Sequence, residues 1–441
     1  MNPNHRELRV LIIGSGPVGA ITASLALEKN FDVTMVDIGC SERELIEDND
    51  LGLKTVDGSV HPYDLGQYTN LDFGDLGYKW RTSKGKFGFS TVWGGTWERL
   101  NSLNTADWDE AYSRVEDIIA RSSREYTNKY SCASINIDKT GGSSPLSLLV
   151  NKNEPDAKIW STDTLISELT ESITFKYTKG YVNMFQENDT EVFIITDKGN
   201  LRGFDVIYLC CGPVGNANLI LNSKPKPAQI ILRDTQIIYI PFFYRKKNKP
   251  CKEITNFPVR SASVFNEEGK IETYFQIYPH VNEYLEQILS KFPKVLRPAL
   301  NPVLRIVFSR IGIALGYRNQ ENSSSISLNS GPITLVKKLA PEKKLSKFTL
   351  MIRSFNKLKS LGLLPMPMFT RFGLPGDSYH LGMAQNFVQP GHGSVEGFGR
   401  VFAFGAIALP SLEPGPITYS AMAQAVIGFN YSLEKLPKLR Q

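Results

Sequence analysis

Three glycines and an aspartate near the start of the chain have the types and the spacing needed to hold a dinucleotide. Gly14, Gly16 and Gly19 directly follow an apolar run. Gly14 permits a tight turn, Gly16 lets the backbone approach a pyrophosphate, and Gly19 lets the next helix pack closely against a sheet. A second apolar run, at 33–36, ends at Asp37, which lies eighteen residues after Gly19. We expect its carboxylate to accept hydrogen bonds from ribose hydroxyls.

A strand, a turn, a helix and a second strand are needed to position these residues. The sequence supplies them in that order, with a strand at 10–13, a helix at 20–29 and a strand at 33–36. We therefore predict a βαβ unit over about residues 7–40. The start of its helix would offer N–H groups and a positive dipole end to phosphates. In the alternative interpretation the glycines only form a turn and Asp37 is a solvated carboxylate, but the complete order favours a nucleotide.

Two further stretches have compositions that suit contact with a bound ring system. Residues 88–97 combine glycines with Trp93 and Trp97, so the backbone could approach a flat ring that the tryptophans enclose; a buried aromatic turn would have the same composition. Residues 206–215 form an apolar strand followed by a small-residue turn at Gly212. Such a turn flanks the cofactor at the carboxyl ends of strands in dinucleotide-binding domains. An ordinary strand-to-helix turn remains an equal alternative.

The last seventy residues return to glycine-rich turns. A loop at 377–383 holds His380, a strand is predicted at 401–404, and small residues follow it at 405–411. A final helix is predicted at 417–433, where Pro416 is compatible with helix initiation. That helix would direct its positive end toward whatever group it faces.

Length and composition indicate a globular protein of more than one domain. The chain has 441 residues, of which 41% are hydrophobic and 21% charged, and we expect two domains. The net charge of +6 weakly favours an anionic partner, such as a phosphate, a nucleotide or an acidic lipid surface. The sequence has no concentrated basic and aromatic patch of the kind that would indicate binding to nucleic acid. Five cysteines without framework spacing predict reduced thiols in a cytoplasmic protein, and no cysteine–histidine cluster predicts a metal site.

The domain organisation follows from changes in pattern along the chain. We predict that residues 1–235 form a dinucleotide-binding domain with a loop insertion at about 41–80. Residues 236–370 would form a second domain, and residues 371–441 would return to the first. Elements expected elsewhere are a helix at 107–120, strands at 192–196 and 206–211, and, in the second domain, alternating strands at 273–278, 325–328 and 347–353.

The second domain contains a basic, proline-interrupted stretch at 284–315. Pro293, Pro298 and Pro302 divide it, and five lysines and arginines charge it, so it is too polar to span a bilayer. Its pattern is compatible with contact with a membrane surface and also with a lid-like helical insertion.

Taken together, these patches resemble the glucose–methanol–choline family of FAD-dependent oxidoreductases, in a short and distant bacterial form. The glycine turn with Asp37 is similar to the family's FAD fingerprint, and residues 88–95 to its flavin-contacting loop, also found in pyranose oxidase. Residues 206–221 and the tail are similar to its later strand, turn and helix segments. The resemblance implies an α/β fold: a doubly wound, Rossmann-like FAD-binding domain with a second antiparallel-sheet α+β substrate domain.

The resemblance also implies the cofactor and the residues around it. Val92 stands where some members carry a histidine bonded to the flavin, so FAD would be held non-covalently. The residues that the resemblance places against FAD are Gly14, Gly16, Pro17, Gly19, Asp37, Ser90, Thr91, Trp93, Gly94, Gly95, Val182, Cys211, Gly212, Gly405, Ala406, Gly415, Pro416, Ile417 and Thr418.

His380 matches the histidine that lies beside the flavin ring in the family. The implied reaction is oxidation of an alcohol CH–OH group, in which His380 accepts the hydroxyl proton and a hydride passes to flavin N5. Histidine suits this role because its ordinary pKa of about 6.5 lies near working pH. His392 is a second candidate. The implied substrate is a small molecule, a sugar or a glycan of surface-polysaccharide pathways, handled in the cytoplasm or at the inner face of the membrane.

Two departures from the family pattern leave alternatives open. Pro414 or Gly415 stands where the family carries its second catalytic group, and Gly405 stands where an acid is often found. The first departure is compatible with a redox-silent flavin- or nucleotide-binding protein. Hydroxylases and amine oxidases begin with the same fingerprint, although the turn at Gly405 lacks the glycine–aspartate pair typical of hydroxylases. The sequence leaves the oligomeric state and the choice between oxidase and dehydrogenase open.

Overall fold

The structure is a computed structural model of the chain. It describes residues 8–39, 63–64, 71–72, 82–83, 85–91, 96, 98–99, 103, 105–122, 126–128, 148–151, 157–244, 260–278, 293–294, 296–308, 310–331, 334–342, 346–376 and 380–436. Most of the predicted insertion at 41–80 therefore lies outside the described residues, as do Val92, Trp93, Gly94, Gly95 and Trp97.

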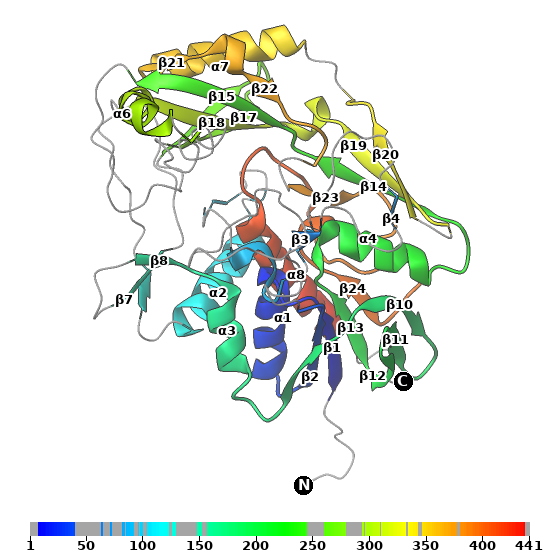
Figure 1. Cartoon of the computed structure of the whole chain (residues 1–441). Coiled ribbons are helices and arrows are strands. Elements are labelled where there is room, and N and C mark those ends of the chain that lie inside the picture. The colour runs from blue at the N-terminus through cyan, green and yellow to red at the C-terminus, as the bar shows by residue number, and fades with distance from the viewer. Residues whose placement is uncertain are drawn as a thin grey trace.

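A five-stranded parallel sheet organises the half of the molecule that contains both termini (Figure 1). Its strand order is β24-β13-β1-β2-β9, and every neighbouring pair is parallel. Residues 10–13 of β1 and all of β13 are apolar and buried, because helices and a small antiparallel sheet cover the two faces of the sheet. The strands are β1 (Arg9–Ile13), β2 (Asp32–Asp37), β9 (Phe175–Lys179), β13 (Val206–Leu209) and β24 (Val401–Ala403).

Helices cover one face of this sheet and leave its carboxyl edge open. The buried side chains of four helices form one core with alternate residues of β1, β2 and β13. The helices are α1 (Pro17–Glu28), α2 (Ala106–Ser122), α3 (Thr162–Leu169) and α8 (Thr418–Lys435). The opposite face packs against α4 (Gly212–Ser223) and against a sheet formed by β10 (Val182–Glu187), β11 (Val192–Thr196) and β12 (Gly199–Phe204).

A mixed sheet connects this half to the rest of the chain. Its order is β23-β14-β19-β20-β4, and it is antiparallel except between β20 and β4. The strand β14 leaves the parallel-sheet half after α4, and β23 carries the chain back into it. The strands are β4 (Leu71–Asp72), β14 (Gln229–Asp234), β19 (Ser325–Asn329), β20 (Thr334–Leu339) and β23 (Leu381–Ala384).

A six-stranded antiparallel sheet lies at the other end of the molecule, as Figure 1 shows. Its order is β16-β17-β18-β15-β21, and β22 pairs with β15. The helix α7 packs on it around Leu358, and α6 contacts β18. The elements are β15 (Ile237–Tyr244), β16 (Arg260–Phe265), β17 (Ile271–Tyr278), β18 (Ile311–Arg318), β21 (Leu363–Pro365), β22 (Arg371–Phe372), α6 (Arg297–Phe308) and α7 (Lys347–Ser360).

Short strands and turns complete the described part of the chain. Two small sheets pair β3 (Tyr63–Asp64) with β5 (Thr82–Ser83), and β6 (Tyr126–Asn128) with β7 (Leu148–Asn151) and β8 (Ala157–Ile159). The 3-10 turns are η2 (Gly88–Thr91), η4 (Gln320–Asn322), η5 (Pro367–Phe369) and η6 (Ala406–Ala408). None of the described helices has both the length and the apolar character that crossing a bilayer would require.

The predicted fold class is confirmed, and two of the predicted elements are wrong. Residues 347–353, predicted as a strand, begin α7 because Leu350, Ser354 and Leu358 recur at helical spacing and are buried. The Ser346 hydroxyl oxygen caps this helix by accepting a hydrogen bond from the Phe348 N–H at 3.2 Å. The second wrong element is the stretch 284–315, whose pattern is compatible with a helical insertion. Its residues 297–308 form α6, but its end, from Ile311, belongs to the strand β18. Residues 284–292 lie outside the described part.

Candidate active site

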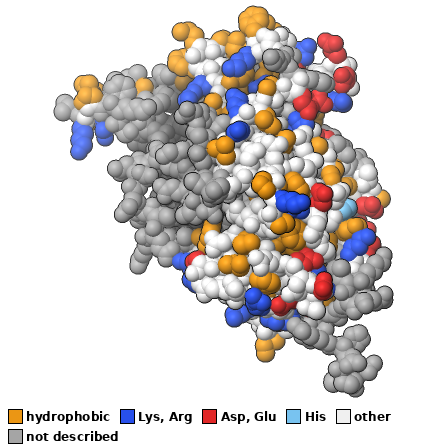
Figure 2. All heavy atoms as spheres, turned by 90° about the vertical axis from the view of Figure 1, so that its right-hand side faces the viewer, with side chains coloured by type: hydrophobic (Ala, Val, Ile, Leu, Met, Phe, Trp, Pro, Cys, Tyr) orange, Lys and Arg blue, Asp and Glu red, His pale blue; other side chains and the backbone are white. Residues whose placement is uncertain are grey.

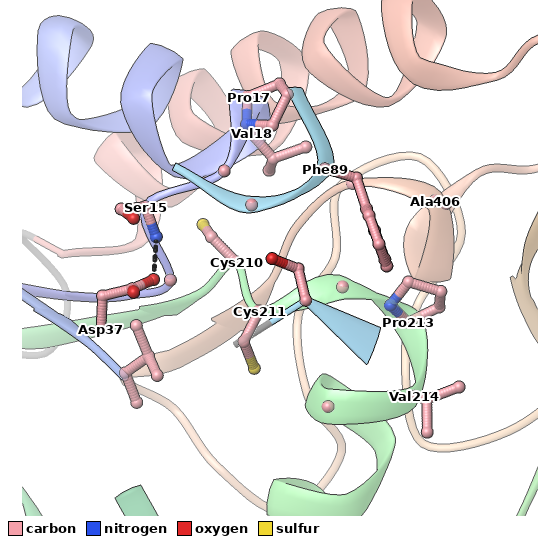
Figure 3. A pocket seen from close by; sticks show the side chains of 18 of the residues that line it. Ser15, Pro17, Val18, Asp37, Phe89, Cys210, Cys211, Pro213, Val214 and Ala406 are labelled. Atoms are coloured by element: carbon pink, nitrogen blue, oxygen red, sulfur yellow. Dashed lines mark hydrogen bonds between the residues drawn. The ribbon is translucent and has the colours of Figure 1, made fainter. Parts of the chain in front are cut away.

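A cavity of about 300 Å³ lies at the carboxyl edge of the parallel sheet. Segments far apart in the sequence line it: the glycine turn after β1, the end of β2, the η2 turn, the β13–α4 turn, the β24–η6 turn and the start of α8. Figure 3 shows side chains from several of these segments converging on one space. Open parallel sheets bind their ligands at this edge.

Packing within the protein explains two of the three glycines. Gly14 has a φ of +105°, and a Cβ there would lie 2.6 Å from the carbonyl oxygen of Cys210. A Cβ on Gly19 would lie 2.0 Å from the carbonyl oxygen of Gly14, so α1 approaches the turn too closely for a side chain. The packing of the protein itself therefore requires glycine at both positions.

Gly16 is different because no described part of the protein requires it to be glycine. Its φ of −68° and ψ of −177° suit any residue, and a Cβ there would meet no described atom within 4 Å. Gly16 precedes the first residue of α1 and lines the cavity. A side chain would occupy the space in front of the helix N-terminus, where N–H groups favour an anion. This open cradle fits the pyrophosphate of a dinucleotide.

Asp37 lines the same cavity from the end of β2. Its carboxylate oxygens accept hydrogen bonds from the backbone N–H groups of Ser15 and Gly39, each at 2.7 Å. Figure 3 shows the bond from Ser15. Burial raises the pKa of this carboxyl above its ordinary value, and the hydrogen bonds from Ser15 and Gly39 oppose that rise. The carboxylate is fixed against the glycine turn and keeps lone pairs that can accept from further hydroxyl groups.

The η2 turn crosses the glycine turn and closes one side of the cavity. The Ser15 hydroxyl accepts from the Phe87 N–H at 2.9 Å, and the Ser90 hydroxyl donates to the Phe87 carbonyl at 2.8 Å. Ser90 lines the cavity. Phe89 points into it, toward Pro213 and Ala406 (Figure 3). Sequence reasoning included this stretch but did not single out Phe89.

Two buried amides, which sequence reasoning missed, fix the strand ends around the cavity. Asn216 donates from Nδ2 to the carbonyl oxygens of Leu209 (3.0 Å) and Phe404 (3.2 Å), and its Oδ1 accepts from the Cys211 N–H at 3.0 Å. Gln424 of α8 accepts from the Gly405 N–H at 2.6 Å. Asn216 contacts a residue 188 positions away and Gln424 contacts one 19 positions away, so local pattern gives no sign of either bond.

Replacing Asn216 with alanine should destabilise the protein by about 3 kcal/mol, because buried carbonyl and N–H groups would lose their partners. Urea unfolding of the variant and the parent measures this change. Asn222→Ala is the matched control, since Asn222 is only partly buried and donates to one carbonyl, that of Asn183, at 3.2 Å. Equal losses in the two variants would contradict the role given to Asn216.

His380 lies just before β23, next to the cavity. It is not itself among the lining residues, but its neighbour Leu381 is. The imidazole stacks on Tyr317 with ring centroids 4.5 Å apart and a 20° interplanar angle, and it is hydrogen-bonded to the backbone of Gly415. Burial lowers the pKa of His380 to about 3, and the Gly415 hydrogen bond only partly opposes this. His380 is therefore neutral near pH 7 and able to accept a proton.

The lowered pKa of His380 predicts how stability depends on pH. An unfolded histidine, with a pKa of about 6.5, takes up a proton below that pH, whereas folded His380 takes one up only near pH 3. His380 should therefore remove about 1.4 kcal/mol of stability per pH unit as the pH falls from 6.5 toward 3. The stability difference between the parent and His380→Asn, measured by urea unfolding, should shift by about 2 kcal/mol between pH 7 and pH 5. A constant difference would contradict the buried, neutral state.

A hydrogen-bonded polar cluster from the six-stranded sheet lies beside His380. Tyr317, which stacks on His380, donates to the side-chain oxygen of Gln276 at 2.9 Å, and Gln276 donates to Thr96 at 2.9 Å. Tyr274 donates to Glu98, whose pKa burial raises, and the Tyr274 ring would lie 3.5 Å from a Cβ on Gly415. This cluster places polar groups on the side of His380 that faces the antiparallel sheet.

The structure brings most of the predicted cofactor residues to one cavity. Those that line it are Gly14, Gly16, Pro17, Asp37, Ser90, Val182, Cys211, Gly212, Gly405, Ala406, Ile417 and Thr418. Gly19, Thr91, Gly415 and Pro416 are described but do not line it. Trp93, Gly94 and Gly95 lie outside the described residues. His392 does not line the cavity either; it stacks on Tyr431 at a centroid distance of 4.0 Å.

Comparison with known proteins gives a likeness of fold. No family model and no curated protein sequence matches the chain. Two similar solved structures are pyridoxine 4-oxidase from Mesorbium loti and an FAD-dependent oxidoreductase from Chaetomium thermophilum. The first has a TM-score of 0.59 at 12% sequence identity, and the second has 0.55 at 11%. Each alignment covers 97% of this chain and 99% of the other. The chain therefore shares the fold of these oxidoreductases over nearly its whole length.

Proposed function

We propose that the protein is an oxidoreductase that binds FAD non-covalently and oxidises an alcohol carbon of a small molecule or glycan. The observation that carries the proposal is the open cradle at Gly16, which lies at the N-terminus of α1 and at the carboxyl edge of the parallel sheet. The shared fold with an FAD-dependent oxidoreductase supports the choice of FAD.

The residues that line the cavity suit the successive parts of FAD. The Gly16 turn and the start of α1 would hold the pyrophosphate, and Asp37 the ribose. The turns at Cys211 and Gly405 and the start of α8 would contact the rest of the cofactor, with the helix dipole of α8 favouring negative charge there. When bound, FAD would supply the hydride acceptor. Val92 has no side-chain group that could bond covalently to a flavin.

His380 would hold the proton that leaves the substrate hydroxyl. Its ring is neutral, and the contacts with Tyr317 and Gly415 fix its plane. The low pKa makes the His380 ring a weak base. Negative charge developing nearby would raise the pKa of His380, because an opposite charge favours the imidazolium. The polar groups of Tyr274, Gln276 and Glu98 would orient substrate hydroxyls on the same side.

The test is reduction of the bound flavin by candidate alcohols without air. The purified protein should carry a flavin spectrum that bleaches with at least one alcohol, sugar or glycan, and repeating the titration in air tells an oxidase from a dehydrogenase. A protein that holds flavin but is bleached by amines would instead be an amine oxidase. Bound flavin that no donor reduces, although dithionite bleaches it, would favour the redox-silent alternative that Pro414 and Gly415 leave open.

A further inference from the structure

The end of the molecule farthest from the parallel sheet carries a group of exposed large apolar side chains. Met368 and Phe369 of η5 are 93% and 60% exposed, and Phe348 and Ile352 of α7 are 65% and 43% exposed. The two α7 residues lie one helical turn apart and project on the same side. Single exposed apolar residues are common, whereas groups of them mark interaction surfaces.

These residues belong to adjoining elements. The helix α7 packs on β21, and η5 directly follows β21 in the chain. Figure 1 shows α7, β21 and β22 together at the top of the molecule. Figure 2 shows hydrophobic and basic side chains at that end, with acidic side chains along one side of it. We call the exposed side chains of α7 and η5, with the basic residues among them, the basic apolar face.

Basic side chains predominate on α7 and η5. Residues 343–376 contain seven lysines and arginines and no aspartate or glutamate. Lys347, Lys359 and Arg371 are exposed there. The nearby acids of the β16–β17 turn have basic partners: Glu267 lies 3.6 Å from Arg353, and Glu268 lies 3.2 Å from Lys270. Arg353 of α7 is therefore neutralised by Glu267 and by Glu272, whose carboxylate lies 3.0 Å away, whereas Lys347, Lys359 and Arg371 form no ion pair with any described residue.

A second basic segment adjoins the same sheet. The helix α6 contacts β18, and exposed Lys294 and Leu296 immediately precede it. Residues 287–310 contain five lysines and arginines and again no acid. Basic charge and exposed apolar side chains thus occur together on two elements of this sheet.

We propose that the basic apolar face docks on the surface of an anionic lipid bilayer. Such a surface offers negative headgroups to the lysines and arginines and an apolar layer to Phe348, Met368 and Phe369. A second copy of the chain does not suit this face, because a two-fold contact would place two positive surfaces against each other. The proposal goes beyond the oxidoreductase reaction and does not depend on FAD.

The test is co-sedimentation of the full-length purified protein with vesicles. Binding should occur with vesicles of phosphatidylcholine and phosphatidylglycerol, and it should weaken with added salt and without phosphatidylglycerol. The Phe348→Ser/Met368→Ser variant should bind at least ten-fold more weakly, because it loses apolar contacts with the bilayer. The Lys347→Gln/Lys359→Gln variant should bind about 25-fold more weakly, or about five-fold for each lost cation.

Control variants lose one apolar side chain or two cations on the other half of the molecule. Ile173 is fully exposed in the turn before β9, so Ile173→Ser removes an equivalent apolar side chain. Lys29→Gln/Lys226→Gln removes the same charge from exposed sites. Both controls should bind like the parent. Binding that is absent, or equally strong in all variants, would overturn the proposal, as would a dimer in light scattering that Phe348→Ser/Met368→Ser dissociates. The visible spectrum of each variant reports flavin binding separately.

Discussion

Replacing Gly16 with valine is expected to leave the protein folded and without flavin. The backbone angles of Gly16 suit valine, and a Cβ there meets no described atom within 4 Å. The valine methyl groups would instead fill the space that the pyrophosphate of FAD needs. We expect the affinity for FAD to fall at least 100-fold, which corresponds to about 2.7 kcal/mol. Flavin absorbance per protein chain measures the loss, and the melting temperature of the apo-protein checks the fold.

Two companion variants separate a lost ligand from a damaged fold. Gly16→Ala adds one carbon to the same open space and should retain more FAD than Gly16→Val. Gly19→Ala places a Cβ 2.0 Å from the Gly14 carbonyl oxygen, so it should lower the melting temperature of the apo-protein as well as the flavin content. If Gly16→Val binds FAD as tightly as the parent, the pyrophosphate does not lie at Gly16 and the proposed site is wrong.

Replacing His380 with alanine is expected to slow flavin reduction by substrate about 100- to 10,000-fold while leaving FAD bound. Removing the imidazole takes away the group that accepts the hydroxyl proton. FAD should remain because His380 is not among the residues that line the cavity. Anaerobic single-turnover reduction in a stopped-flow instrument measures the chemical step separately from substrate binding. Added imidazole should restore part of the rate.

His392→Ala is the control for this experiment. His392 stacks on Tyr431 and does not line the cavity, so its loss should leave the reduction rate within a few-fold of the parent. In the parent, protonation of a single base should make flavin reduction slower at low pH. The flavin-reduction rate of His380→Ala should not show this decline. A His380→Ala protein that reduces its flavin at the parental rate would show that another group accepts the proton, and Glu98 would be examined next.

The parallel-sheet half could be predicted because local pattern determines it. The run before Gly14, the apolar period of residues 107–120 and the strand at 192–196 each identify an element without reference to distant residues. The prediction for residues 347–353 was wrong because their apolar residues, taken over a short window, fit alternation. Only the continuation to Leu358 and the Ser346 cap reveal α7.

Much of the site's support could not be predicted because it depends on long-range contacts. Asn216 bonds to the Phe404 carbonyl across 188 positions, and Gln276 bonds to Thr96 across 180. Asparagine and glutamine are ordinary residues on a helix or a strand surface, so nothing in the sequence near them indicates a buried partner. The stacking of His380 on Tyr317 likewise depends on β18 and β23 approaching each other in space.

The most direct test of the central claim is titration of the purified, flavin-depleted protein with FAD. The account predicts saturation at one FAD per chain, a visible flavin spectrum that remains after gel filtration, and release of the free cofactor on denaturation. A colourless protein that takes up no added FAD would contradict the account. So would FAD that stays covalently attached to the chain after denaturation.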